Sequence, residues 1–178
     1  METKETAIRG RLAAQKLPRW DELPDIELYM DQLLGLIRRY LGTYPGFDEK
    51  GLTASMVNNY VKQGVVPSPV KKRYGREQLS RLIIVCLLKS SFPIAAIRRL
   101  LEGEQVRHSP AELYNMFCDK FESAVVETAG PAEADAGGSP YTGILRAALR
   151  AQAERALALQ LFAEVFPEEK AEKPEKKK

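Results

Sequence analysis

The sequence predicts a mainly α-helical protein with one small β ribbon near the middle of the chain. Apolar residues recur at three- and four-residue steps in several segments, the spacing of a helix that buries one face. Proline and glycine interrupt these segments at intervals that suit helix ends. The stretch 65–75 instead combines valines, prolines and basic residues, which favours short edge strands. A chain of 178 residues has room for one domain with a helical extension.

The N-terminal segment 1–24 is predicted to hold a short helix over 4–15 and a connector, because Pro18 disfavours helix in the residue before it. An amphipathic helix is predicted over 25–41, and Gly42 follows as its stop. The apolar face of this second helix consists of Ile26, Met30, Leu33, Leu34, Ile37 and Leu41.

The next predicted helix, 54–63, has two very different faces. Thr53 is a suitable N-cap and Gly64 a suitable stop. Its apolar face carries Val57, Tyr60 and Val61, and its polar face carries Ser55, Asn58, Asn59 and Lys62. Asparagine lowers helix stability, so two in succession suggest a purpose such as hydrogen bonding to DNA bases. The alternative is that the helix simply tolerates both asparagines.

Residues 65–75 are predicted to form a two-stranded ribbon, or wing, that projects from the core. Pro67 and Pro69 exclude a central strand, so the sheet must be small. The ribbon ends in Lys71, Lys72, Arg73 and Tyr74, and Arg76 follows. Its cations are expected to contact phosphates, which makes binding depend on salt.

Positive charge is concentrated in one part of the chain. Residues 61–99 contain nine basic side chains and one acidic one, a net charge of +8, whereas the whole chain carries +3. The remaining residues therefore sum to −5. A local basic field suggests a surface that binds a polyanion, and a solvated helix surface is the other interpretation of the same charges.

The second half of the chain is predicted to be helical. A core helix over 76–90 and a short helix over 94–101 complete a domain at 25–104. A C-terminal region at 105–166 holds helices over 109–128 and 141–166, through which we expect a homodimer to form. The charged segment 167–178 is expected to be disordered.

Other function classes have little support. Cys86 and Cys118 are widely separated within apolar segments, and His108 is the only histidine, so we expect no metal site and no cofactor. No nucleophile, base and acid set or phosphate-binding glycine loop indicates an enzyme. The longest apolar run, 82–88, is too short to cross a membrane and no signal peptide is evident, so we expect a cytoplasmic protein.

The order of these signals resembles the DNA-binding half of MerR-type regulators. The matching residues between 53 and 101 are Tyr60, Gly64, Pro67, Tyr74, Leu79, Leu82, Ile94, Ile97 and Leu101. Through the segment Val57-Asn-Asn-Tyr-Val-Lys62, the chain more closely resembles a YkrK-like bacterial family whose domain has no established function. The resemblance implies a winged helix-turn-helix core. It departs where Asn58 and Asn59 replace the usual Arg-Tyr pair and where the loop before the recognition helix is longer.

The sequence thus predicts a regulator of transcription that binds double-stranded DNA in a sequence-specific manner. The recognition helix would lie in the major groove and the wing on the phosphate backbone. The residues expected to contact DNA are Ser55, Asn58, Asn59, Tyr60, Lys62, Lys71, Lys72, Arg73, Tyr74 and Arg76. The alternative is a winged-helix module that binds another protein and no DNA. The sequence indicates no effector, operator or target gene.

Overall fold

A computed structural model describes residues 4–44, 47, 51–130 and 140–167. Most of these residues are helical, which confirms the mainly α-helical prediction. The helices are α1 (Lys4–Ala13), α2 (Met30–Leu41), α3 (Ala54–Lys62), α4 (Arg76–Leu88), α5 (Ile94–Gln105), α6 (Pro110–Ala129) and α7 (Pro140–Val165), with a 3-10 turn, η1, at Trp20–Glu22. The chain divides into two compact units, Met1–Ala132 and Glu133–Lys178, and the second contains α7.

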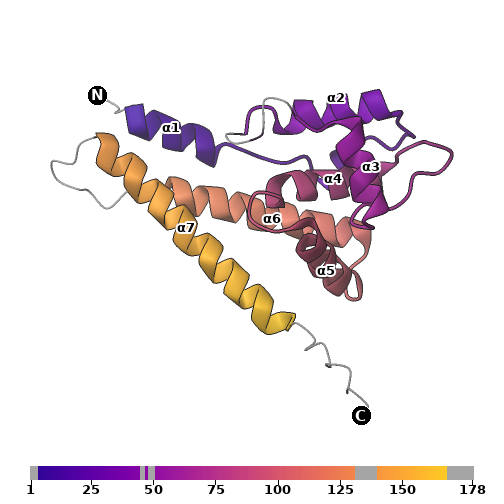
Figure 1. Cartoon of the computed structure of the whole chain (residues 1–178). Coiled ribbons are helices and arrows are strands. Elements are labelled where there is room, and N and C mark those ends of the chain that lie inside the picture. Colours follow the sequence, from indigo (N-terminus) through magenta and orange to yellow (C-terminus); the bar gives the residue numbers. More distant parts are fainter. Residues whose placement is uncertain (1–3, 45–46, 48–50, 131–139, 168–178) are drawn as a thin grey trace, which may run out of the picture. The chain divides into compact units, whose positions relative to one another are not determined.

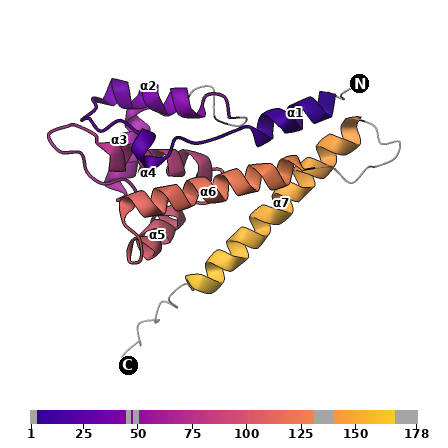
Figure 2. The same ribbon diagram turned by 180° about the vertical axis from the view of Figure 1, so that it is seen from behind.

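Helix α4 forms the centre of the first unit and packs against α2, α5 and α6 (Figures 1 and 2). Every residue from Leu79 to Cys86 is buried. A helix that is apolar on all sides can be stable only when other elements surround it. The sequence predicts this central helix, and the structure confirms it with an end two residues earlier, at Leu88.

Helix α2 begins at Met30, not at residue 25 as the sequence predicted. Leu28 is extended and buried, and it forms an antiparallel bridge with Tyr74. The Leu28 N–H donates to the Tyr74 carbonyl at 2.8 Å, and the Tyr74 N–H donates to the Leu28 carbonyl at 2.9 Å. This pairing removes residues 25–29 from the helix and leaves Ile26, an expected core residue, 64% exposed. Helical periodicity alone could not reveal a partner so distant in the chain.

Side-chain caps define the starts of both α3 and α6, and the cap at Thr53 was expected from the sequence. The Met56 N–H donates to Thr53 Oγ1 at 3.2 Å, and Gly64 follows α3 with a φ of 73°. Ser109 caps α6, because its Oγ accepts from the Glu112 N–H at 3.3 Å while its own N–H donates to the Glu112 carboxylate at 2.8 Å. These residues satisfy N–H groups that the first turn leaves unpaired, so the predicted helix starts are confirmed.

Helix α1 lies along the C-terminal part of α6 (Figure 1). The Arg9 guanidinium donates to the carbonyls of Thr128 and Gly130, each at 3.1 Å. A cation at this position satisfies carbonyls that the helix end leaves unpaired, and it complements the helix dipole. The N-terminal helix is thereby attached to the end of the longest helix in its unit.

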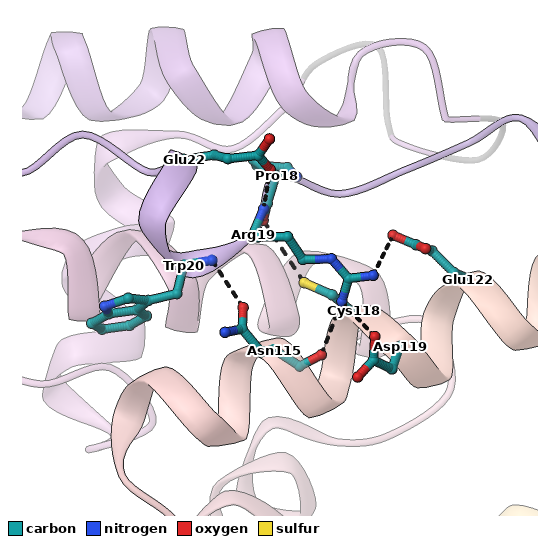
Figure 3. Close-up of polar contacts among 8 residues, drawn as sticks. All are labelled: Pro18, Arg19, Trp20, Glu22, Asn115, Cys118, Asp119 and Glu122. Atoms are coloured by element: carbon teal, nitrogen blue, oxygen red, sulfur yellow. Dashed lines mark hydrogen bonds and ion pairs between the residues drawn. The ribbon is translucent and has the colours of Figure 1, made fainter.

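The connector before α2 is held to α6 by a polar network (Figure 3). Arg19 forms ion pairs with Asp119 at 2.6 Å and Glu122 at 3.0 Å. The Trp20 N–H donates to the Asn115 Oδ1 at 2.9 Å. These contacts hold the connector where it crosses α6, and the Asn115 side chain satisfies the Trp20 N–H.

Both cysteines are free and buried. Burial raises the pKa of the Cys86 thiol and that of the Cys118 thiol to about 11. The Cys118 Sγ also lies 3.8 Å from the Pro18 carbonyl, as Figure 3 shows. Both groups therefore stay protonated at neutral pH and serve as packing residues.

Three findings limit the remaining expectations. Within the described residues no strand forms, so the predicted β wing is not supported as a sheet. Residues 131–139, between the last two predicted helices, and nearly all of the charged segment 167–178 (168–178) lie outside the described residues. In the described part of the chain, the helices are too short or too polar to cross a membrane.

Replacing Asn115 with alanine is expected to lower the free energy of unfolding by about 1 kcal/mol, since the Trp20 N–H loses its acceptor and alanine's helix propensity offsets part of that loss. Urea denaturation measures the change. Asn115→Asp retains an acceptor and is the matched control, so it should remain close to the native value. Equal stability of the alanine variant and the native protein would contradict this role.

Candidate nucleic-acid interface

The polar face of α3 is open to solvent along its length. Ser55, Asn58, Asn59 and Lys62 are all exposed, as their spacing in the sequence implies. On the opposite face, Val57 is completely buried and holds the helix on the core. The structure thus brings together two amides, a hydroxyl and an ammonium group on one side of a fixed helix.

Two of the predicted contact residues lie in the core instead. Tyr60 is 5% exposed and Tyr74 is 4% exposed, and burial raises the pKa of both phenols. Tyr60 belongs to α3, and its carbonyl accepts the Val65 N–H at 3.1 Å. Tyr74 pairs with Leu28 through the backbone. Both tyrosines lie beneath the exposed surface, and almost none of either side chain is part of that surface.

The segment predicted to form the wing, residues 65–75 (the wing segment), contains a tight turn with Lys71 and Lys72 at its centre. The Val70 N–H donates to the Arg73 carbonyl at 3.1 Å, and the Arg73 N–H donates to the Val70 carbonyl at 2.8 Å. Lys71 has a φ of 49° and Lys72 a φ of 63°. A two-residue hairpin with positive φ at both central residues is a type I′ turn. A minimal hairpin therefore stands where the sequence predicted a longer ribbon.

The residue types at this turn are unfavourable for its geometry. Type I′ turns strongly prefer Asn-Gly, whereas a side chain such as lysine pays about 1–2 kcal/mol in the left-handed region. Both Lys71 and Lys72 are exposed, so packing does not explain them. Backbone strain of this kind is concentrated at functional sites. The turn presents two ammonium groups at the cost of local stability.

Arg73 lies against an aromatic ring that the sequence analysis missed. Its guanidinium carbon is 3.9 Å from the centroid of the Tyr29 ring, a cation–π contact. Tyr29 is half exposed, so the pair forms part of the surface beside the turn. The sequence prediction placed Tyr29 inside a helix, and only the pairing of Leu28 with Tyr74 brings it to Arg73. No signal in the sequence alone points to this contact.

Arg76 faces the connector more than the solvent. Its guanidinium lies 3.7 Å from the Asp25 carboxylate and 5.7 Å from the centroid of the Trp20 ring. Its Nε is enclosed and has no hydrogen-bond partner among the described residues. The first residue of α4 thus joins the turn to the N-terminal connector, and its charge is partly neutralised there.

The net charge of +8 counted over residues 61–99 is larger than the charge that this segment exposes at the surface. Arg81 is only 4% exposed, and Arg98 forms an ion pair of 2.7 Å with Glu102 from outside the counted segment. Within α3 and the turn at 70–73, the exposed cations are Lys62, Lys71 and Lys72, and Arg73 is partly exposed. The candidate interface is accordingly a narrow one, composed of the α3 face and the turn at 70–73.

In the described segments, no three cysteine, histidine or acidic side chains are grouped as a metal ion would require. The profile of a domain of unknown function (DUF1836) matches residues 18–117. The chain belongs to the DUF1836 family. The matched range extends from the connector to the middle of α6, so it includes α2 to α5 and the whole candidate interface.

Neither a curated protein nor a solved structure matches this DUF1836 chain. The expectation of a domain family without established function is confirmed. The more specific resemblance to MerR-type regulators gains no support from these comparisons. This resemblance therefore stays a hypothesis.

We expect the double substitution Lys71→Asn and Lys72→Gly to raise the free energy of unfolding by about 0.5–1 kcal/mol, because these residues accept positive φ with less strain. Urea denaturation at moderate salt measures it. Replacing both lysines with alanine makes the same change in charge and retains the strain, so that control should show no such gain. A native protein more stable than the Asn-Gly variant would refute the strain argument.

Proposed function

We propose that this protein is a sequence-specific regulator of transcription that binds double-stranded DNA through a winged helix-turn-helix core. Helix α3 would enter the major groove, whose width admits an α-helix, and residues 65–75 would lie on the phosphate backbone. Helix α2 would be the helix preceding the recognition helix. The proposal includes no enzymatic activity, cofactor or effector.

The observation that carries the proposal is the pairing of an exposed amide-rich helix face with a strained, doubly cationic turn. Asn58 and Asn59 lie on the exposed side of α3, and Lys71 and Lys72 hold left-handed conformations. Asparagine can form two hydrogen bonds with adenine, and lysine contacts guanine or phosphate. DNA binding would explain both the asparagines within α3 and the lysines in the strained turn, two unfavourable choices of residue.

The predicted contact residues take different roles in this proposal. Ser55, Asn58, Asn59 and Lys62 would read bases, and Lys71, Lys72 and Arg73 would neutralise phosphates. Tyr60 and Tyr74 would fix the position of these groups from the core, consistent with their burial. Arg76 would hold the base of the turn through Asp25 and Trp20. Tyr29 would orient Arg73.

We also propose a homodimer formed through the C-terminal helices, with α7 as its main contact. Helix α7 carries an exposed apolar ridge at four-residue spacing, formed by Leu145, Leu149, Leu157, Leu161 and Val165. An antiparallel pair centred on Leu157 would set Leu149 against Val165 of the second copy. The same register would set Arg150 against Glu164, whereas a parallel pair would set like charges together. A twofold dimer suits operators with two half-sites.

A module that binds another protein is the second candidate, and exposed apolar groups near the turn favour it. Tyr29 and Val70 both adjoin Arg73 and are more than half exposed, as is Ile26. Such residues can serve as anchors in a protein interface. The turn with its two lysines would then bind an acidic partner. The experiment below separates these candidates.

The first experiment is a fluorescence-anisotropy titration with a pool of random DNA duplexes at low and physiological salt. The native protein is compared with Lys71→Asn/Lys72→Gly/Arg73→Gln, which keeps a turn of favourable residues but removes three charges. This variant should bind all sequences more weakly, and the slope of log affinity against log salt should fall by up to about three.

The matched control removes three exposed cations elsewhere, with Arg11→Ala/Arg107→Ala/Lys120→Ala. Its net charge equals that of the turn variant, so any general charge effect appears in both. Equal losses in the two variants would place DNA contact away from the turn. No binding by the folded native protein at low salt would reject the DNA proposal and favour the protein-binding module.

A selected DNA site then tests the reading face. Asn58→Ala and Asn59→Ala should each reduce the preference for that site over random DNA by about 1–3 kcal/mol. Their affinity for random duplexes should change little, because they do not contact phosphates in this proposal. Retained sequence preference in both variants would assign the reading face elsewhere.

For the dimer, Leu157→Glu should give a monomer at micromolar concentration by sedimentation, because it sets two carboxylates against each other at the twofold axis. Gln152→Glu adds the same charge to another side of the exposed helix and should leave the dimer intact. A native protein that sediments as a monomer at this concentration would contradict the proposal.

A further inference from the structure

The central helix α4 contains one buried cation without a counter-ion in contact. Arg81 is 4% exposed, and its Nη2 has no hydrogen-bond partner among the residues that the structure describes. Glu77 and Glu102 act on it electrostatically, but within the described residues neither forms an ion pair with it. An unpaired charge in a protein interior is costly, so such a group calls for a functional explanation.

Arg81 lines a small cavity of about 40 Å³ between the end of α3, the start of the wing segment and α5. Gly64, Val65, Arg98 and Glu102 also line this cavity. Its volume is near that of one water molecule in the liquid, about 30 Å³. The cavity therefore has room for one or two ligand oxygens, with the rest of a ligand remaining outside.

Arg98 places a second guanidinium beside the first. Its Nε lies 3.5 Å from the position that a Cβ on Gly64 would occupy, and its Nη1 is 3.4 Å from the Gln63 carbonyl. Gly64 also has positive φ, a backbone conformation that glycine adopts without strain. Arg98 is exposed and pairs with Glu102, so it lies at the accessible side of the cavity.

We propose that this cavity binds a phosphate-type oxyanion, with its oxygens held by Arg81 and Arg98. Two guanidiniums exceed the single carboxylate of Glu102 by one positive charge, and guanidinium groups match the geometry of phosphate oxygens. An entering oxygen would satisfy the enclosed Nη2 of Arg81. Desolvation already lowers the pKa of this guanidinium, and the opposing influence of Glu77 and Glu102 is smaller.

The oxyanion has two sources that share this chemistry, a phosphate of the DNA backbone and a free phosphate. The cavity adjoins the C-terminal end of α3, so an anion there would hold the proposed reading helix against α5 and the wing segment. The inference does not depend on DNA binding, because a free phosphate can fill the site in the absence of DNA.

The test is a titration of the full chain with potassium phosphate, monitored by ¹H–¹⁵N spectra. A titration with potassium chloride at equal ionic strength and pH is the reference. The backbone amides of Gly64 and Val65 should shift in a saturable manner with phosphate alone. Arg98→Ala should weaken this binding about tenfold, the loss of one charge-assisted contact. Arg107→Ala removes an exposed cation that does not line the cavity, and it should bind phosphate as the native protein does.

Two further variants distinguish the cavity from general charge. Glu102→Gln removes the competing carboxylate and should tighten phosphate binding several-fold. Arg81→Met fills a similar volume without charge, so it should fold at least as well as the native protein and lose the phosphate response. If Arg81→Met does not fold, Arg98→Ala and Glu102→Gln still decide the outcome.

The DNA arm measures the salt dependence of duplex binding for Arg81→Met and Arg98→Ala. A slope reduced by about one in both variants would assign the site to a backbone phosphate, since the enclosed Arg81 can meet DNA only through the cavity. A saturable response to free phosphate with an unchanged slope would assign it to a small anion. Absence of both effects would overturn the inference, and absence of all duplex binding would leave the phosphate arm to decide it.

Discussion

The double hydrogen bond between Leu28 and Tyr74 is the interaction on which the candidate interface depends. It ends the extended connector, allows α2 to start at Met30 and fixes the chain just before α4 begins. It also brings Tyr29 beneath Arg73, beside the turn at Lys71 and Lys72. Because the two residues are far apart in the chain, this pairing depends on tertiary structure, and so does the surface beside it.

Around the pairing of Leu28 with Tyr74, the cationic side chains differ in how deeply they are buried. Lys71 and Lys72 are at the surface in a strained conformation, Arg76 is mostly enclosed beside an acid and an aromatic ring, and Arg81 is inside the core. Solvent screens the outermost charges most, whereas low dielectric strengthens the influence of the innermost one. The exposed cations would attract a polyanionic partner at long range. The more buried cations would contact it only after it has docked.

Much of the fold follows from local rules. Thr53, Ser109 and Gly64 mark helix ends through their own chemistry, and the apolar run around Ile83 requires a buried helix, so these elements could be predicted. The start of α2 could not, because Ile26 and Met30 fit one helical face and the competing bond to Tyr74 is non-local. For the candidate site, periodicity identified the exposed face of α3, but the Tyr29 contact and the cavity at Arg81 depend on tertiary packing.

The two thiols described with the core have a practical consequence. Cys86 and Cys118 are buried, and their pKa values near 11 leave almost no thiolate at neutral pH. A cysteine introduced at an exposed site such as Ser55 or Ser68 would thus be the principal target of a maleimide dye without removal of the native ones. Fluorophores on α3 and on the wing segment would then report distances to any ligand in a chain whose interior is unaltered.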